Sequence, residues 1–207
     1  MSALAMFPLG SVLLPGEVLP LHVFEPRYRQ MVRDCLAADV PEFGVVLISR
    51  GSEVGGTDQR TGVGTVARLV EVGELPDGRF VMVAVGTRRV RVRTWLPDDP
   101  YPLADVDDWP EDDDDADTLE VLLTRLGPRV RRAAALATEL GDQSRQTTDE
   151  LPDDPLLASH ALVSLAPIGA LDRHELLCAS GPVARLERLE ALLDDVEAVL
   201  DFRLREG

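Results

Sequence analysis

The hydrophobic pattern of this 207-residue chain changes its period across one acidic, proline-rich segment, residues 97–117. The segment contains eleven acidic residues, four prolines and no basic residue. Before it, Val-rich runs of strand length are separated by Gly, Pro and Asp, whereas beyond it leucines recur at helical spacing. We therefore predict an α+β fold with a β-rich lobe over residues 1–110 and an α-helical bundle lobe over residues 111–207. The acidic segment itself is expected to be a boundary rather than a strand.

The β-rich lobe is predicted from four runs of strand length: Phe43–Ile48, Val63–Val72, Phe80–Val85 and Val90–Trp95. The second and third runs are joined through Leu75-Pro76-Asp77-Gly78. Because Pro presets φ and Gly accepts a positive φ, these two runs should form an antiparallel hairpin. One helix is expected to interrupt the strands. It begins at Pro26 and places one apolar face toward the core, made of Tyr28, Met31, Val32, Cys35 and Leu36.

The helical lobe begins with a stripe of leucines from Leu119, and Gly127-Pro128 should kink or break this helix. A second helix is predicted to begin at Asp154-Pro155 and to stop at Pro167. A third, short helix is expected from Asp172, because Asp172 and Glu175 match a capping box.

The last helix is predicted to begin at Pro182. Its apolar stripe should pack against the other helices and contains Leu186, Leu189, Leu193, Val196 and Leu200. The charged residues between these positions are expected to remain in solvent, namely Arg185, Glu187, Arg188 and Glu190.

The charge of the chain limits its partners. The formal net charge is −16, and only 4% of the residues are aromatic. A strongly negative protein repels phosphate backbones and anionic membrane surfaces, and it has few rings on which bases could stack. We therefore expect neither nucleic acid nor a membrane as the main partner.

The chain contains no lysine at all. A P-loop needs a lysine that reaches the β- and γ-phosphates, and a Ser-Lys dyad needs an amine as base, so both kinds of site are excluded. No G-x-S-x-G elbow is present, and His22, His160 and His174 are the only imidazoles. We expect a protein that is not an enzyme and that requires no cofactor.

The cysteines indicate neither a disulfide framework nor a metal centre. Cys35 and Cys178 lie far apart, which favours a reducing compartment. His174 and Cys178 are four residues apart and could present two ligands to zinc, but no third ligand follows nearby, so a packed helix is favoured and no metal is expected. The sequence shows no signal peptide or membrane-spanning run, and a cytoplasmic location is expected.

An arginine-rich run, residues 88–93, suggests a second kind of binding site. Alternation along a strand would place Arg89, Arg91 and Arg93 on one face, where they could bind phosphate or carboxylates together with Arg88. The alternative is a solvated outer face whose charge is neutralised by the many acidic residues of the chain. RNA or anion binding through these arginines is therefore the second functional hypothesis.

The N-terminal part of the chain carries a long motif that resembles a known family. Phe7-Pro8-Leu9, Leu14-Pro15-Gly16 and the run from Leu19 to Arg29 resemble the opening of the Lon protease N-terminal domain family. Further similar positions lie at Phe43-Gly44-Val45-Val46 and in Val63–Ala67, so the resemblance extends over essentially the whole chain.

This resemblance implies a PUA-like β-barrel lobe with one embedded helix, followed by a helical lobe. It also implies a protein-recognition module without the ATPase and protease parts of Lon, in a chain that ends at Gly207. The expected partners are unfolded or partner proteins, with a separately encoded protease or chaperone acting beside it. A peptide-binding groove is predicted around residues of the motif: Leu13, Leu14, Leu19, His22, Arg27 and Tyr28. The alternative reading is that the motif residues only shape the fold.

Overall fold

The computed structural model describes residues 3–50, 59–112, 115–142 and 150–206. It divides into two compact units, Met1–Pro110 and Glu111–Gly207, and each unit is described here by itself. None of the helices in the described part of the chain is long and apolar enough to cross a membrane.

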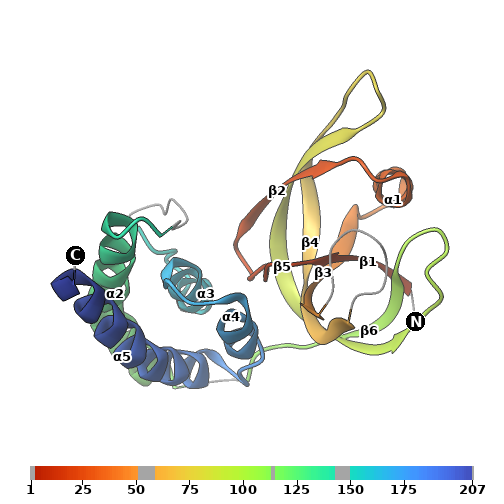
Figure 1. Cartoon of the computed structure of the whole chain (residues 1–207). Helices are drawn as coiled ribbons and strands as arrows, with labels where there is room; N and C mark the ends of the chain where they lie inside the picture. Colours follow the sequence, from red (N-terminus) through yellow and green to blue (C-terminus); the bar gives the residue numbers. More distant parts are fainter. Residues whose placement is uncertain (1–2, 51–58, 113–114, 143–149, 207) are drawn as a thin grey trace. The chain divides into compact units, whose positions relative to one another are not determined.

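The first unit is a mixed β-sheet that closes on itself and carries one helix (Figure 1). The order of the strands is β2-β5-β4-β3-β1-β6, and a further pairing of β5 with β6 closes the ring. Only β1 and β3 are parallel among the pairs described. The predicted barrel lobe with an embedded helix is confirmed. Its elements are β1 Ala3–Leu9, β2 Val18–Val23, α1 Pro26–Ala37, β3 Glu42–Arg50, β4 Gln59–Glu74, β5 Phe80–Trp95 and β6 Leu103–Asp108.

Strand β5 is one 16-residue strand, and the prediction of two separate runs within it was wrong. Its first part, residues 80–85, pairs with β2, whereas residues 90–95 pair with β6. Strand β4 pairs along both parts, with an irregularity in register opposite Thr87, between the partners Gly86 and Arg88. The polar residues that separate the two predicted runs therefore mark a change of partner and a bulge, which increases the local bend.

Strand β6 lies inside the segment that was expected to be only a boundary. Leu103–Asp108 pairs with β1 on one side and with β5 on the other, and Ala104 is fully buried. The prediction was wrong because Asp107 and Asp108 give this strand the acidic composition that is typical of a boundary segment. Both are exposed, and both form ion pairs with arginines of β5.

The core of the first unit lies between the barrel strands and α1. The rings of Phe7 and Tyr28 stack with their centroids 4.2 Å apart, and Phe43 packs at 6.1 Å from Phe7. The helix buries Tyr28, Met31, Val32 and Cys35 as predicted. Leu36 was assigned to the same face but is exposed, because it lies at the edge of this apolar stripe.

The second unit contains α2 Ala116–Glu139, α3 Pro155–Leu165, α4 Ala170–Leu177 and α5 Pro182–Glu206, as predicted for a helical lobe. The carboxylates of Asp115 and Asp154 cap α2 and α3. Helix α4 begins at Ala170 after Gly169, two residues before the expected start, and Asp172 lies in its first turn rather than at its cap. The capping-box prediction was therefore wrong.

Helix α2 continues through Pro128, and the predicted break is absent. A proline in a helix interior costs about 3 kcal/mol because one hydrogen bond is lost and the ring crowds the preceding turn. Leu126 and Val130 flank the proline and are fully buried. Packing of this apolar face against the neighbouring helices offsets the local cost.

Arg185 of α5 was expected in solvent but is fully buried. Its Nη2 donates to both carboxylate oxygens of Glu111, its Nη1 donates to Ser159 Oγ at 2.9 Å, and its Nε donates to the carbonyl of Leu176 at 3.2 Å. His160 Nε2 lies 3.1 Å from Glu111 Oε1. The guanidinium is buried because this polar cluster supplies partners that water would otherwise provide.

Candidate recognition surface

Four residues of the predicted peptide groove lie in the core of the first unit. The exposed fractions are 3% for Leu13, 0% for Leu14, 8% for Leu19 and 3% for Tyr28. These four side chains pack inside the first unit in this conformation, and a peptide-binding groove at the motif stays a prediction.

The motif that carries these residues shapes the fold through backbone contacts. Gly16 has a φ of 84°, and its N–H donates to the carbonyl of Gly86 at 2.8 Å. Thr65 Oγ1 donates to the carbonyl of Leu13 at 2.6 Å. A Cβ atom on Gly86 would lie 2.3 Å from the carbonyl oxygen of Leu14. The Leu14-Pro15-Gly16 turn therefore needs glycine both in the turn and in the strand beneath it.

The two other residues of the predicted groove are accessible. His22 is exposed on β2, with its ring edge-on to Phe24 at a centroid distance of 6.4 Å. Arg27 is partly exposed, forms an ion pair with Glu25 at 3.0 Å and lies over the Tyr28 ring at 4.5 Å. Arg27 is therefore engaged locally, and His22 belongs to a different surface from the buried leucines.

That surface is the outward face of β2 and the paired half of β5. In the register of the two strands, Val18 lies opposite Val85, Pro20 opposite Val83 and His22 opposite Val81. Alternate residues point to the same side of a sheet, so these side chains form one ladder, which Phe24 extends beyond β2. We call this surface the apolar sheet face, and it consists of Val18, Pro20, His22, Phe24, Val81, Val83 and Val85.

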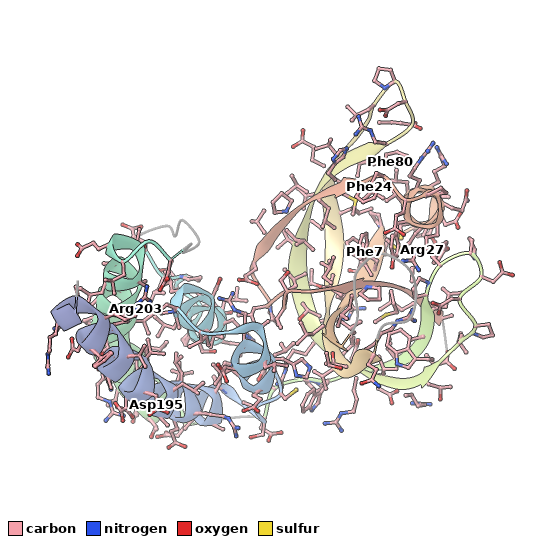
Figure 2. All side chains as sticks on the ribbon, in the orientation of Figure 1. Phe7, Phe24, Arg27, Phe80, Asp195 and Arg203 are labelled. Atoms are coloured by element: carbon pink, nitrogen blue, oxygen red, sulfur yellow. The ribbon has the colours of Figure 1, made fainter. Side chains whose placement is uncertain are left out.

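The apolar sheet face is accessible along its length. The exposed fractions are 60% for Val18, 55% for Phe24 and 50% for Val81. Figure 2 labels Phe24 where the chain leaves β2 and approaches α1. On β4, exposed Arg68 and Glu71 lie opposite Val85 and Val83, so a charged border follows the apolar ladder. Contiguous exposed apolar side chains with a polar border are typical of a protein-binding surface.

Strand β2 is at the edge of the sheet, and in the described residues it pairs only with β5. Pro20 lies in the middle of this edge strand and has no N–H to offer to a further strand. A partner that extends the sheet at β2 would therefore lack a backbone donor there. The accessible feature of β2 is its side-chain face.

The arginines of the alternative anion site contact groups of their own chain. Arg88 pairs with Glu42 at 2.8 Å and with Asp108 at 2.9 Å, and Arg93 pairs with Asp107. Arg91 lies over the ring of Trp109 at 4.1 Å. Arg89 is only 3% exposed, lies 4.5 Å from the same ring and donates to the carbonyl of Pro110 at 3.2 Å.

Glu42 forms ion pairs with Arg88 of β5 and with Arg68 of β4. Burial raises the pKa of its carboxyl, but hydrogen bonds from Arg88 and Arg68 lower it by more, so the pKa of Glu42 lies below the ordinary value.

The bulge at Arg93 directs this side chain toward Asp107, and Arg89 points inward. Arg89, Arg91 and Arg93 therefore do not form the single row on one strand face that alternation predicts. An external phosphate would have to displace these carboxylates.

Among the described residues, no group of three or more His, Cys, Asp or Glu side chains is arranged to hold a metal ion. The acidic run at 112–115 lies partly outside the described residues. Within it, Asp115 accepts hydrogen bonds from the N–H and the hydroxyl of Thr118 as the cap of α2.

Residues 3–195 match the model of the ATP-dependent protease La (LON) substrate-binding domain. Lon protease 2 of Herpetosiphon aurantiacus is 27% identical over 96% of this chain, and Lon protease 2 of Myxococcus xanthus is 30% identical over 97%. The chain spans only 24% and 22% of the length of these two proteases.

Two solved structures are similar over nearly the whole chain. The Lon N-terminal domain protein from Xanthomonas campestris has a TM-score of 0.65 and 31% identity, covering 92% of this chain and 98% of that one. The N-terminal domain of the Mycobacterium avium complex Lon protease has a TM-score of 0.63 at 18% identity, covering 95% of this chain and 98% of that one, and it shows the shared fold.

Proposed function

This chain belongs to the family of Lon substrate-binding domains, and we propose that it recognises other polypeptide chains through the apolar sheet face. The partner we propose is an extended apolar segment of an unfolded or partner protein. The single observation that carries the proposal is the exposed ladder formed by Val18 and Val85, Pro20 and Val83, and Phe24 beside His22 and Val81.

The binding energy would come from side chains rather than from an added strand. Removing apolar surface from water is worth about 25 cal/mol per Å², so a few contacts with exposed valines and Phe24 support weak, exchangeable binding. Pro20 disfavours strand addition at β2, which limits recognition of a partner backbone. Such a site accepts many apolar sequences, as a module that samples unfolded chains requires.

The charge of the protein favours apolar segments flanked by basic residues. Exposed Glu71 and Glu74 of β4 lie close to the face, opposite Val83 and Phe80 of β5, and the chain has a net charge of −16. Long-range attraction raises the rate of encounter with a basic partner and is screened by salt. We therefore propose Lys- or Arg-flanked apolar segments as the preferred partners.

Recognition is the whole of the proposed role for this region. The residues of this chain contain no lysine and therefore no P-loop. We propose that a separately encoded protease or chaperone hydrolyses ATP and cleaves the bound partner. We propose that recognition by this chain occurs in the cytoplasm, where unfolded chains with exposed apolar segments arise.

The proposal is tested by titrating the full chain into a fluorescently labelled apolar peptide with basic flanks and measuring anisotropy. Val81→Asp should weaken binding about tenfold or more, because a carboxylate would be desolvated against the peptide. The matched control is Val121→Asp on α2, where Val121 is similarly exposed at 61%. Equal affinity of the Val81→Asp protein and the wild type would exclude the apolar sheet face as the site.

A further inference from the structure

The helical unit contains a thiol and an imidazole side by side at the wall of an open cavity. Cys178 Sγ lies 3.8 Å from both His174 Nδ1 and His174 Nε2. The cavity is open to solvent and has a volume of about 480 Å³. Its other lining residues are Glu175, Ala179, Ala184, Glu187 and Arg188.

The local sequence explains this geometry. His174 lies in the last turn of α4, and Cys178 is the residue that ends the helix, with its N–H bonded to the carbonyl of His174 at 3.0 Å. Residues four apart on a helix share a face, so the two side chains meet. Ala184, in the first turn of α5, is too small to cover them.

The two cysteines of the chain lie in different environments. Cys35 is buried in the core, its Sγ contacts the carbonyl of Glu42 at 3.4 Å, and burial together with Asp34 raises its pKa to about 11. Cys178 is partly exposed and borders the cavity. Accessibility and a nearby proton acceptor are what distinguish reactive thiols from structural ones.

Some charges around Cys178 favour ionisation of its thiol, and others oppose it. His174 can accept the thiol proton, and the positive charge of Arg188 favours a thiolate. Glu175, Glu187 and the C-terminus of α4 oppose it. Arg188 also pairs with Glu175, so its guanidinium is held at the rim of the cavity.

We propose that Cys178 is a modification site that forms a mixed disulfide with small amino-acid or peptide disulfides. Arg188 binds a carboxylate of the incoming molecule, and Glu187 binds its ammonium group. His174 accepts the proton of the Cys178 thiol, and the thiolate attacks one sulfur of the disulfide. A bond forms between Cys178 and that sulfur, the original disulfide bond breaks, and the departing thiolate takes the proton from His174. Cys178 is oxidised and the departing sulfur is reduced, so no further oxidant is needed.

The test incubates the full, folded chain with glutathione disulfide and follows adduct formation by intact-mass spectrometry with peptide mapping. We expect one glutathionyl group per chain, which is lost in Cys178→Ser and retained in Cys35→Ser. His174→Gln should slow the reaction at neutral pH by at least about tenfold and shift its pH dependence upward, since the base is removed. Absence of an adduct, an adduct on Cys35, or an unchanged pH profile in His174→Gln would overturn the proposal.

A second probe separates carboxylate recognition from simple thiol exposure. Cystamine is a disulfide of similar reactivity that has ammonium groups but no carboxylate. Arg188→Gln should slow the reaction with glutathione disulfide clearly more than the reaction with cystamine, which loses only the effect of Arg188 on the thiolate. An equal effect on both probes would contradict the assigned role of Arg188. Far-ultraviolet circular dichroism checks that each variant is folded.

Discussion

Arg185 Nη2 lies 2.8 Å from each carboxylate oxygen of Glu111, and the guanidinium is fully buried. Glu111 is the first residue of the helical unit, so this contact fixes the start of the unit to α5. The next residue is held in the same unit, because the N–H of Asp112 donates to the carbonyl of Ser180 at 3.0 Å. The residues that follow the β-rich unit are thus attached to the helices by a buried charge pair.

Removal of one partner from this pair should destabilise the helical unit strongly. Arg185→Ala leaves the Glu111 carboxylate without its main partner, and breaking a buried pair in this way costs about 3–5 kcal/mol. Urea unfolding followed by circular dichroism measures the change. Arg188→Ala is the control, because its ion pair with Glu175 is exposed and should contribute little. Equal midpoints for Arg185→Ala and Arg188→Ala would contradict the structural role of Arg185.

The contact between Gly86 and the Leu14 carbonyl predicts a steric effect. Gly86→Ala would place Cβ 2.3 Å from a backbone oxygen, so β5 or the Leu14-Pro15-Gly16 turn must move, at a cost of more than about 2 kcal/mol. Gly62→Ala in β4 is a matched control, since no atom lies within 4 Å of its Cβ position. Thermal unfolding of both variants checks this. Similar melting temperatures would show that the turn does not lie on Gly86 as described.

The lowered pKa of Glu42 predicts a loss of stability in acid. The unfolded chain binds the proton at a higher pH than the folded chain does, so the stabilisation is present above the ordinary pKa and disappears as pH falls through the lowered one. The difference in unfolding free energy between wild type and Glu42→Gln should therefore shrink between about pH 5 and pH 3. Urea titrations across this range measure it. A difference that is constant with pH would contradict the ion pairs with Arg88 and Arg68.

The internal pairing of the β5 arginines predicts that RNA does not bind there. Filter binding of a single-stranded RNA at low salt, where phosphate contacts are strongest, should show no retention above that of an Arg91→Ala, Arg93→Ala double variant. Salt-dependent retention that the double variant loses would instead establish the anion site at these residues.

The sequence was most informative where a pattern depends on neighbouring residues. The helix from Pro26, the Leu75–Gly78 turn and the start of α5 at Pro182 follow from local backbone chemistry, and the structure has all three. The family resemblance added the barrel, whose ring closes through β5 and β6 and involves residues far apart in sequence.

The sequence was least informative where distant residues decide burial. Arg185 matches a solvated helix position, and its burial depends on the distant partners Glu111, Ser159 and the Leu176 carbonyl. Leu13 and Leu14 belong to a conspicuous motif, but their burial depends on Thr65 and Gly86. The apolar sheet face is indicated by one feature of the sequence. In Val18–Phe24, apolar residues occur at both the odd-numbered and the even-numbered positions, which indicates a strand whose outer side is also apolar.

Recognition through the apolar sheet face is tested by locating a bound peptide on the chain. A basic-flanked apolar peptide carrying a benzophenone photocrosslinker is irradiated with the full chain, and the adducts are mapped by mass spectrometry. We expect adducts on residues 18–24 and 81–85, which Val81→Asp reduces. Adducts confined to the helical unit or to residues 88–93, with none on β2 or the first part of β5, would contradict recognition through the apolar sheet face.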